Sequence, residues 1–172
     1  MHLLRQERDD ALAQRSWLDR QRYRPQQWSS RARWQVYGVG AGEPWFGFEG
    51  VRELDGLPPE FLMVTLPGHT LGHAGVAVRR DGRWLLQAGD AYFHHAEMHP
   101  EPRCTPGLRM YQWMMEKDRE ARLRNQARLR DLAQAHAADV TVCCAHDPLE
   151  FERLAGRGMD EAPQLLRRAR PR

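Results

Sequence analysis

Three side chains that could bind a metal ion stand in short motifs with separate places along the chain. The motifs are Leu66-Pro67-Gly68-His69-Thr70-Leu71-Gly72-His73, Gly89-Asp90-Ala91-Tyr92 and Ala145-His146-Asp147-Pro148. Imidazole and carboxylate are ligands that zinc takes at sites with an open coordination position. The chemistry that His69, Asp90 and His146 could share is therefore that of a bound metal ion.

Each of these residues taken alone has a simpler explanation. A single loop histidine is more often a surface or hydrogen-bonding residue than a ligand. Asp90 after a glycine fits a turn, and the sequence His146-Asp147-Pro148 fits the start of a helix. The hypothesis of a site depends on the three occurring together, each after a predicted strand.

Short strands are expected to position the three motifs. His69, Asp90 and His146 follow the predicted strands 61–66, 83–88 and 140–144. Strand ends can meet at one edge of a sheet, where loops leave room for an ion and a substrate. Further strands are predicted at 33–37, 46–54 and 74–79, and Arg80-Asp81-Gly82 suits a hairpin turn. This spacing predicts a mainly antiparallel sheet.

Helices are predicted between and after these strands. Residues 5–19 indicate one helix, and residues 108–136 indicate one long helix. Its core-facing side has an i, i+3, i+4, i+7 pattern formed by Leu129, Leu132, Ala133 and His136. A short helix is expected at 148–154, with Asp147 as its N-cap. We expect one domain over 1–155 and a basic, disordered tail over 156–172.

The composition is that of an ordinary globular protein. Hydrophobic residues make up 41% of the chain and the net charge is only +3. No apolar run approaches the roughly 20 residues of a membrane span, and no signal peptide is recognisable, so a cytoplasmic location is expected. The arginines are interleaved with acidic residues, which argues against a nucleic-acid groove. The three cysteines indicate no disulfide framework.

Together the motifs resemble the second half of a metallo-β-lactamase-fold hydrolase, in the branch of glyoxalase II and the acyl-homoserine lactonases. The resemblance covers roughly residues 1–154. It implies an α/β fold, namely the C-terminal portion of an αββα sandwich with a mostly antiparallel sheet and flanking helices. It also implies hydrolysis of a small ester, thioester or lactone at a centre of one or two zinc ions.

The resemblance assigns roles to individual residues. It implies that His69 binds the first metal, that Asp90 bridges both metals and that His146 binds the second. His73 matches a position that supports the ligands through hydrogen bonds. Tyr92, Phe93 and His94 would face the substrate; however, Tyr92 stands two residues after Asp90, where the lactonases have a tyrosine at three. Beyond this set, the neighbours His94 and His95 favour a polar rim over extra ligands.

The first half of the family signature, His-x-His-x-Asp-His, is absent from this sequence. Each of two ions would keep only two protein ligands, fewer than the three usual at catalytic zinc. A fragment of a longer hydrolase is the simplest explanation. The alternatives are a non-catalytic pseudoenzyme or partner-binding half-domain, and a split enzyme completed by another chain. A half-sandwich would leave apolar faces uncovered, so self-association is also expected.

Overall fold

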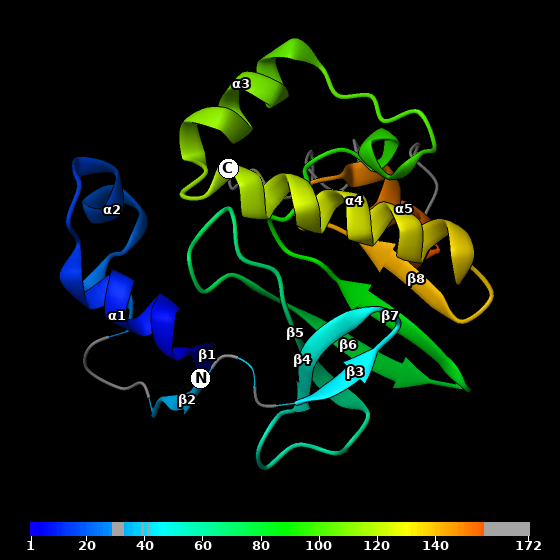
Figure 1. The fold of residues 1–172 in the computed structure, drawn as a ribbon, viewed down its shortest axis with the longest axis horizontal. Helices are drawn as coiled ribbons and strands as arrows, with labels where there is room; N and C mark the ends of the chain where they lie inside the picture. The colour runs from blue at the N-terminus through cyan, green and yellow to red at the C-terminus, as the bar shows by residue number, and fades with distance from the viewer. Residues whose placement is uncertain (29–32, 39, 41, 157–172) are drawn as a thin grey trace, which may run out of the picture.

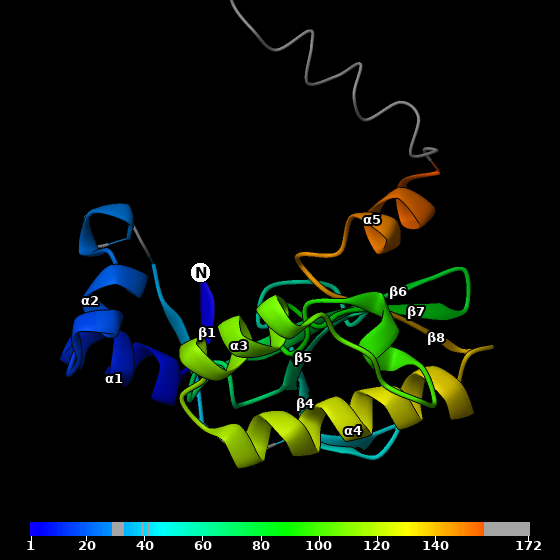
Figure 2. The same ribbon diagram turned by 90° about the horizontal axis from the view of Figure 1, so that it is seen from above.

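A six-stranded sheet forms the centre of the molecule, and helices cover one of its faces (Figures 1 and 2). The computed structural model describes residues 1–28, 33–38, 40 and 42–156. The strands lie in sequence order: β3 (Glu43–Trp45), β4 (Phe48–Glu53), β5 (Phe61–Thr65), β6 (Ala74–Arg80), β7 (Arg83–Gln87) and β8 (Val140–Cys143). Neighbouring strands are antiparallel except β7 and β8, which are parallel. The mostly antiparallel α/β arrangement expected from the sequence is confirmed.

The N-terminal part forms a smaller unit beside the sheet (Figure 1). Here β1 (His2–Leu4) pairs in parallel with β2 (Gln35–Tyr37). Two helices, α1 (Arg5–Ala13) and α2 (Trp17–Arg22), follow β1, and a 3₁₀ turn, η1, spans Pro25–Gln27. The single helix predicted over 5–19 is therefore wrong. Gln14 adopts a left-handed conformation, and Ser16 and Asp19 form a capping box that starts a new helix.

The long helix predicted over 108–136 is likewise two helices. They are α3 (Pro106–Met115) and α4 (Arg119–Ala135). Asp118 accepts a hydrogen bond from the Ala121 amide at 2.9 Å and so acts as the N-cap of α4. The carbonyl of Gly68 accepts hydrogen bonds from the amides of Lys117 and Asp118. The interhelix turn is thereby fixed against the His69 loop.

The strand predicted over 46–54 is confirmed as β4, which begins two residues later and ends one residue earlier than predicted. Phe46 and Gly47 both have positive φ, 44° and 80°, and form the turn between β3 and β4. The remaining strands lie within a residue or two of their predicted bounds. The last helix, α5 (Pro148–Ala155), starts on Asp147 as expected. The tail predicted beyond residue 156 lies outside the described residues.

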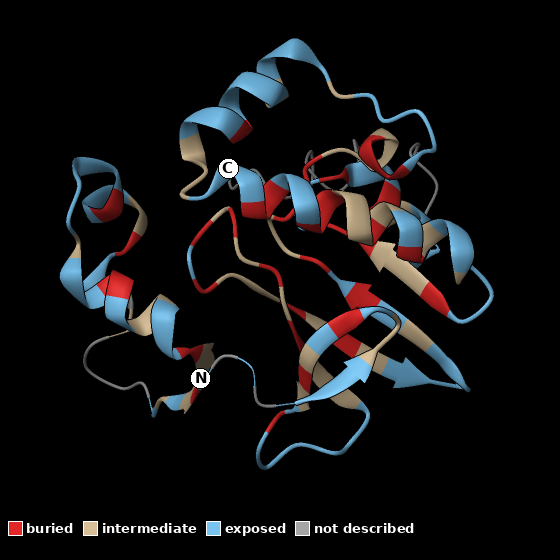
Figure 3. Cartoon of the chain, viewed as in Figure 1, coloured by how far each residue is buried: buried red, intermediate tan, exposed pale blue. Residues whose placement is uncertain are grey.

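The main hydrophobic core lies between the sheet and α4. Leu129 and Leu132 of α4 are almost fully buried and pack in one cluster with Val64, Leu86 and Val140 of the strands. Figure 3 shows the buried face of α4 turned toward the sheet. The predicted apolar side of this helix is thus confirmed at its two leucines. The core holds the strands whose ends carry the candidate site.

Candidate functional site

The ends of three strands bring the candidate ligands to one edge of the sheet. Strands β5 and β7 both run antiparallel to β6, and β8 runs parallel to β7. The C-terminal ends of β5, β7 and β8 therefore point the same way. The loops leaving these ends carry His69, Asp90 and His146.

The carboxylate of Asp90 lies between the two histidines. Its Oδ2 is 3.4 Å from Nε2 of His69, and its Oδ1 is 2.9 Å from Nε2 of His146. The side chain of His69 is mostly buried, at 11% exposure, whereas that of His146 is 58% exposed. Each oxygen of one carboxylate thus faces a different imidazole.

The surroundings of His69 favour its neutral form. Burial lowers the pKa of this imidazole to about 4, outweighing the opposing effect of the Asp90 carboxylate. The positive charge of Arg22 lowers the pKa further. At neutral pH, His69 therefore carries no charge, as a metal ligand must.

His73 supports the site from behind. Its Nδ1 lies 2.9 Å from the Leu66 carbonyl, which fixes the proton on that nitrogen. Its Nε2 accepts a hydrogen bond of 3.0 Å from the backbone amide of Asp90. This single imidazole therefore connects the end of β5 to the residue that bears the central carboxylate. Such a partner orients a ligand without binding the ion itself.

Two glycines allow these close approaches. Gly89 has φ +58°, and a Cβ built there would lie 2.7 Å from Nε2 of His73. Gly68 has φ +143°, and a Cβ there would lie 2.5 Å from the Arg122 backbone. Both positions thus need a residue without a side chain.

The three residues open into one cavity of about 610 Å³. Its polar floor is His69, Asp90 and His146, and Arg22 and His94 also line it. Most of the wall is apolar and comes from α2, α3, the start of α5 and the loop after β7: Leu18, Phe93, Leu108, Tyr111, Met115 and Pro148. A polar floor with apolar walls is the usual form of a small-molecule site.

Tyr92 does not face this cavity, and its expected contact with substrate is corrected. The side chain is fully buried, and its hydroxyl donates to the two carboxylate oxygens of Glu150, at 2.8 and 3.0 Å. Burial raises the pKa of this phenol far above its usual range. Tyr92 therefore ties the loop after β7 to α5. Its neighbours Phe93 and His94 line the cavity instead.

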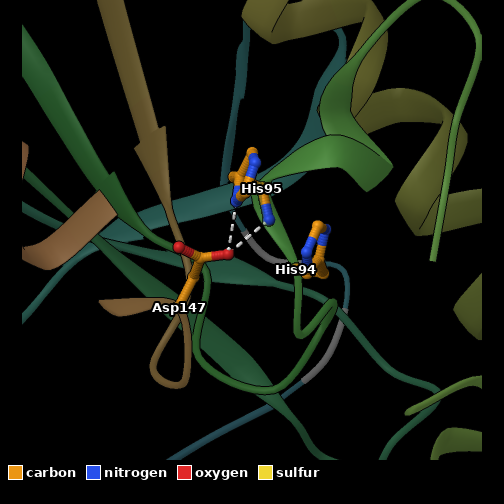
Figure 4. A group of neighbouring side chains, drawn as sticks. All are labelled: His94, His95 and Asp147. Atoms are coloured by element: carbon orange, nitrogen blue, oxygen red, sulfur yellow. Dashed lines mark hydrogen bonds and ion pairs between the residues drawn. The ribbon is translucent and has the colours of Figure 1, made fainter. Parts of the chain in front are cut away.

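His94, His95 and Asp147 form a second cluster near the cavity (Figure 4). Among the described residues, these three have potential ligand atoms that all lie within 4.8 Å of one another. However, the two imidazoles are stacked at 4.3 Å, so an ion in the plane of one ring lies outside the plane of the other.

The Asp147 carboxylate is already fully used in hydrogen bonding. It accepts from Nδ1 and the amide of His95, at 2.8 and 2.7 Å, and from the first amides of α5. Burial alone would raise the pKa of Asp147, but the hydrogen bonds from His95 and from the Glu150 amide together lower the pKa. Asp147 therefore joins the loops after β7 and β8, which carry Asp90 and His146.

Two residues at the site were not identified from the sequence. Arg22 lies 47 positions from the His69 carbonyl that it contacts, and nothing local marks it among so many arginines. Asp147 was identified only as a helix cap. Its second bond, to His95, joins residues 52 positions apart, so no spacing rule could have indicated it.

Known proteins resemble this chain in sequence and in structure. No family model matches it. Two proteins described as probable metallo-hydrolases, from Mycobacterium bovis and Mycobacterium tuberculosis, are each 35% identical to it over 148 residues. The match covers 86% of this chain, which spans 47% of the length of each relative.

Solved structures of other proteins share the fold of this chain. An N-acyl homoserine lactone hydrolase, with the product N-hexanoyl-L-homoserine at its catalytic metal centre, matches with a TM-score of 0.59 at 17% identity. The match covers 88% of this chain and 48% of that one. A hydrolase of the β-lactamase superfamily matches with a TM-score of 0.54 at 16% identity, over 87% of this chain and 48% of that one. This chain carries part of a metallo-β-lactamase fold.

Among the described residues, the donors that face the Asp90 carboxylate are the imidazoles of His69 and His146. The donors fit the chemistry of a metal site, because one carboxylate faces two imidazoles and one of these is held neutral. They supply one imidazole on either side of Asp90. In the described part of the chain, these three residues are fewer than a two-ion site would need if each ion had the three protein ligands usual at catalytic zinc.

Proposed function

We propose that this chain is part of a metal-dependent hydrolase of the metallo-β-lactamase superfamily, acting on esters, thioesters or lactones at a zinc centre. The observation that carries the proposal is the Asp90 carboxylate, whose two oxygens face His69 and His146 at one edge of the sheet. The similarity to probable metallo-hydrolases supports the same class of reaction.

In this proposal, His69 and Asp90 hold one ion, and Asp90 and His146 hold a second. A metal centre of this kind would activate water and polarise the substrate oxygen. His73 holds the Asp90 backbone in place, and Phe93 and His94 line the space for the substrate. The lactonase with a bound acyl-homoserine product is a precedent for a small acylated substrate.

The incomplete donor set favours a second candidate, a non-catalytic domain that binds a partner. Two protein donors per ion are fewer than the three that catalytic zinc usually has. We therefore propose that this chain alone is impaired as a hydrolase. We also propose a cytoplasmic location, with residues 1–155 as the partial domain and 156–172 as a tail. No helix in the described part of the chain is long and apolar enough to cross a membrane.

Hydrolysis assays with added zinc test the proposal. The purified chain should hydrolyse at least one of a p-nitrophenyl ester, an acyl thioester and an acyl-homoserine lactone above the background of free zinc. His146→Ala should remove that activity, whereas His99→Ala, at an exposed position, should not. A rate that survives both a chelator and His146→Ala would contradict the proposal. No hydrolysis by a zinc-loaded chain would favour the non-catalytic candidate.

A further inference from the structure

Arg22 is a cation in the wall of the candidate site. It ends α2, and its guanidinium donates to the carbonyl of His69 at 3.4 Å and to the carbonyl of Met115. It lines both cavities that contain His69 and Asp90. Its position is therefore fixed by the same loop that carries a proposed metal ligand.

The acidic residues around Arg22 are already paired elsewhere. Asp10 and Asp19 both form ion pairs with Lys117. Glu7 accepts hydrogen bonds from the Tyr23 hydroxyl and the Gly72 amide. Within the described part of the chain Arg22 has no carboxylate partner, and its Nε is buried without a hydrogen bond. A cation that is partly removed from water without a counter-ion is unfavourable, and an anionic ligand would offset that cost.

The other charges in the cavity do not compete for this role. Asp147 is fully hydrogen-bonded to His95 and to α5, and Asp90 lies between two imidazoles. Among the described residues, Arg22 is thus a cation at this cavity with hydrogen-bond donors that its two backbone partners do not use. A guanidinium also matches a carboxylate in shape and in donors.

The wall next to Arg22 defines the rest of the ligand. Leu18 from α2, and Leu108 and Met115 from α3, line the same cavity. An aliphatic or acyl group would lie against these side chains. Cation and apolar wall together favour an amphiphilic molecule with an anionic group.

We propose that Arg22 is a specificity-determining residue, which binds a carboxylate group of a substrate whose acyl part lies along Leu18, Leu108 and Met115. The inference deepens the proposed hydrolase function and rests on it, because only a hydrolase would turn over the bound molecule as a substrate. The binding itself requires only the cavity and the guanidinium. It can therefore be tested without turnover.

The test compares two probes of equal length and different charge, octanoate and octanamide, by calorimetric titration of the chelator-treated full chain. We expect octanoate to bind more tightly, and Arg22→Gln to weaken octanoate about tenfold, since hydrogen bonds between charged groups contribute that much or more. Glutamine keeps a hydrogen-bond donor but carries no charge. Octanamide binding should change less than twofold, on the order of experimental error for a neutral probe.

Two further variants separate recognition from structure. Arg22→Lys keeps the charge and should keep most of the preference for octanoate. Arg20→Ala removes an exposed arginine of the same helix and should change neither probe. Equal loss of both probes in Arg22→Gln would mean that Arg22 only holds the loop. Equal binding of both probes to the unaltered chain would also overturn the inference.

The same samples distinguish this inference from the proposed function. Metal binding is measured in parallel on the unaltered chain. Preference for octanoate that depends on Arg22, in a chain that takes up no metal, would support the inference and contradict the proposed hydrolase. Metal uptake without any preference for octanoate would support the proposed hydrolase and contradict the inference about Arg22.

Discussion

Hydrogen bonds and burial favour the neutral form of His73, and burial favours the neutral form of His69. His73 has one nitrogen against the Leu66 carbonyl and the other against the Asp90 amide. Burial lowers its pKa, and burial lowers that of His69 as well. Both imidazoles are consequently neutral at physiological pH. Because neither His69 nor His73 carries a positive charge, these two side chains do not repel a metal cation.

The titration of His69 can be followed directly. We expect its imidazole to titrate near pH 4 in chelator-treated protein, well below the ordinary value of 6.5, because burial disfavours the charged ring. A histidine with a lowered folded-state pKa stabilises the fold above pH 6.5, and this contribution is lost as the pH falls from 6.5 toward 4. Two-dimensional NMR of the ring carbons, with His69→Asn for assignment, measures the midpoint. A midpoint near 6.5 would contradict the burial argument.

Gly89 offers a test of the support behind Asp90. We expect Gly89→Ala to destabilise the protein by about 1 to 3 kcal/mol, because the residue has positive φ and a Cβ there would meet the His73 ring. Gly107→Ala is a matched control, since a Cβ at Gly107 in α3 meets nothing within 4 Å. It should be neutral or stabilising by up to about 1 kcal/mol. Urea unfolding of both variants decides between these outcomes.

At the scale of elements, strands were predicted better than helix boundaries. Strand β5 and the hairpin of β6 and β7 follow from short apolar segments and from the turn Arg80-Asp81-Gly82. The breaks in the helices depend on capping by Ser16 and Asp118, which locally resemble other polar helix positions. A hydrophobic pattern continues through such a break and therefore hides it.

The site itself could be predicted only in part. The sequence indicated that His69, Asp90 and His146 lie close together, because each stands in a motif a few residues after a predicted strand, and the structure has them side by side. The inward position of Tyr92 depends on Glu150, which lies 58 residues away. The place of Arg22 similarly depends on the carbonyls of a distant loop and helix. Contacts of this length leave no periodic signal in the sequence.

The N-terminal helices are attached to the rest of the fold by a buried ion-pair cluster. Lys117, between α3 and α4, pairs with Asp10 of α1 and Asp19 of α2. Although burial alone would raise the pKa of Asp19, the hydrogen bonds from Lys117 and Ser16, together with the charge of Lys117, outweigh burial and lower the pKa. The stability gained from Asp19 is thus present above its ordinary pKa and is lost as the pH falls through the lower folded value.

Removal of Lys117 should release this attachment. We expect Lys117→Met to cost about 3 kcal/mol, because it leaves two buried carboxylates without their cation. Arg124→Ala breaks an exposed i, i+4 pair with Glu120 and should cost no more than about 0.5 kcal/mol. Thermal and urea unfolding compare the two. Equal costs would mean that the cluster does not hold α1 and α2.

Across the whole molecule, large apolar side chains remain on the surface. Trp113 and Met110 of α3 are 62% and 64% exposed, and Trp17 of α2 and Phe151 of α5 are 65% and 64% exposed. Exposed aromatic and methionine side chains at this density favour contact with other molecules. This observation accords with the self-association that the sequence predicts.

Sedimentation velocity over a wide concentration range tests that expectation. We expect the average mass to rise with concentration, and the double variant Met110→Ser, Trp113→Ser to reduce the rise because both side chains lie on one exposed helix. Leu129→Ser would be an unsuitable control, since that residue is fully buried. Arg109→Ser, on the same helix, is the matched polar control. A monomer at every concentration would contradict the expectation.

Metal content per chain tests the central claim, that His69, Asp90 and His146 form a metal site. The protein is loaded with zinc, passed into chelator-free buffer and measured by elemental analysis beside Asp90→Asn, which keeps the shape of the side chain and removes its charge. The account predicts about one retained ion per chain or more, and a loss of at least half in Asp90→Asn, because Asp90 faces both histidines. Retention that is far below one ion, or that is unchanged in Asp90→Asn, would contradict it.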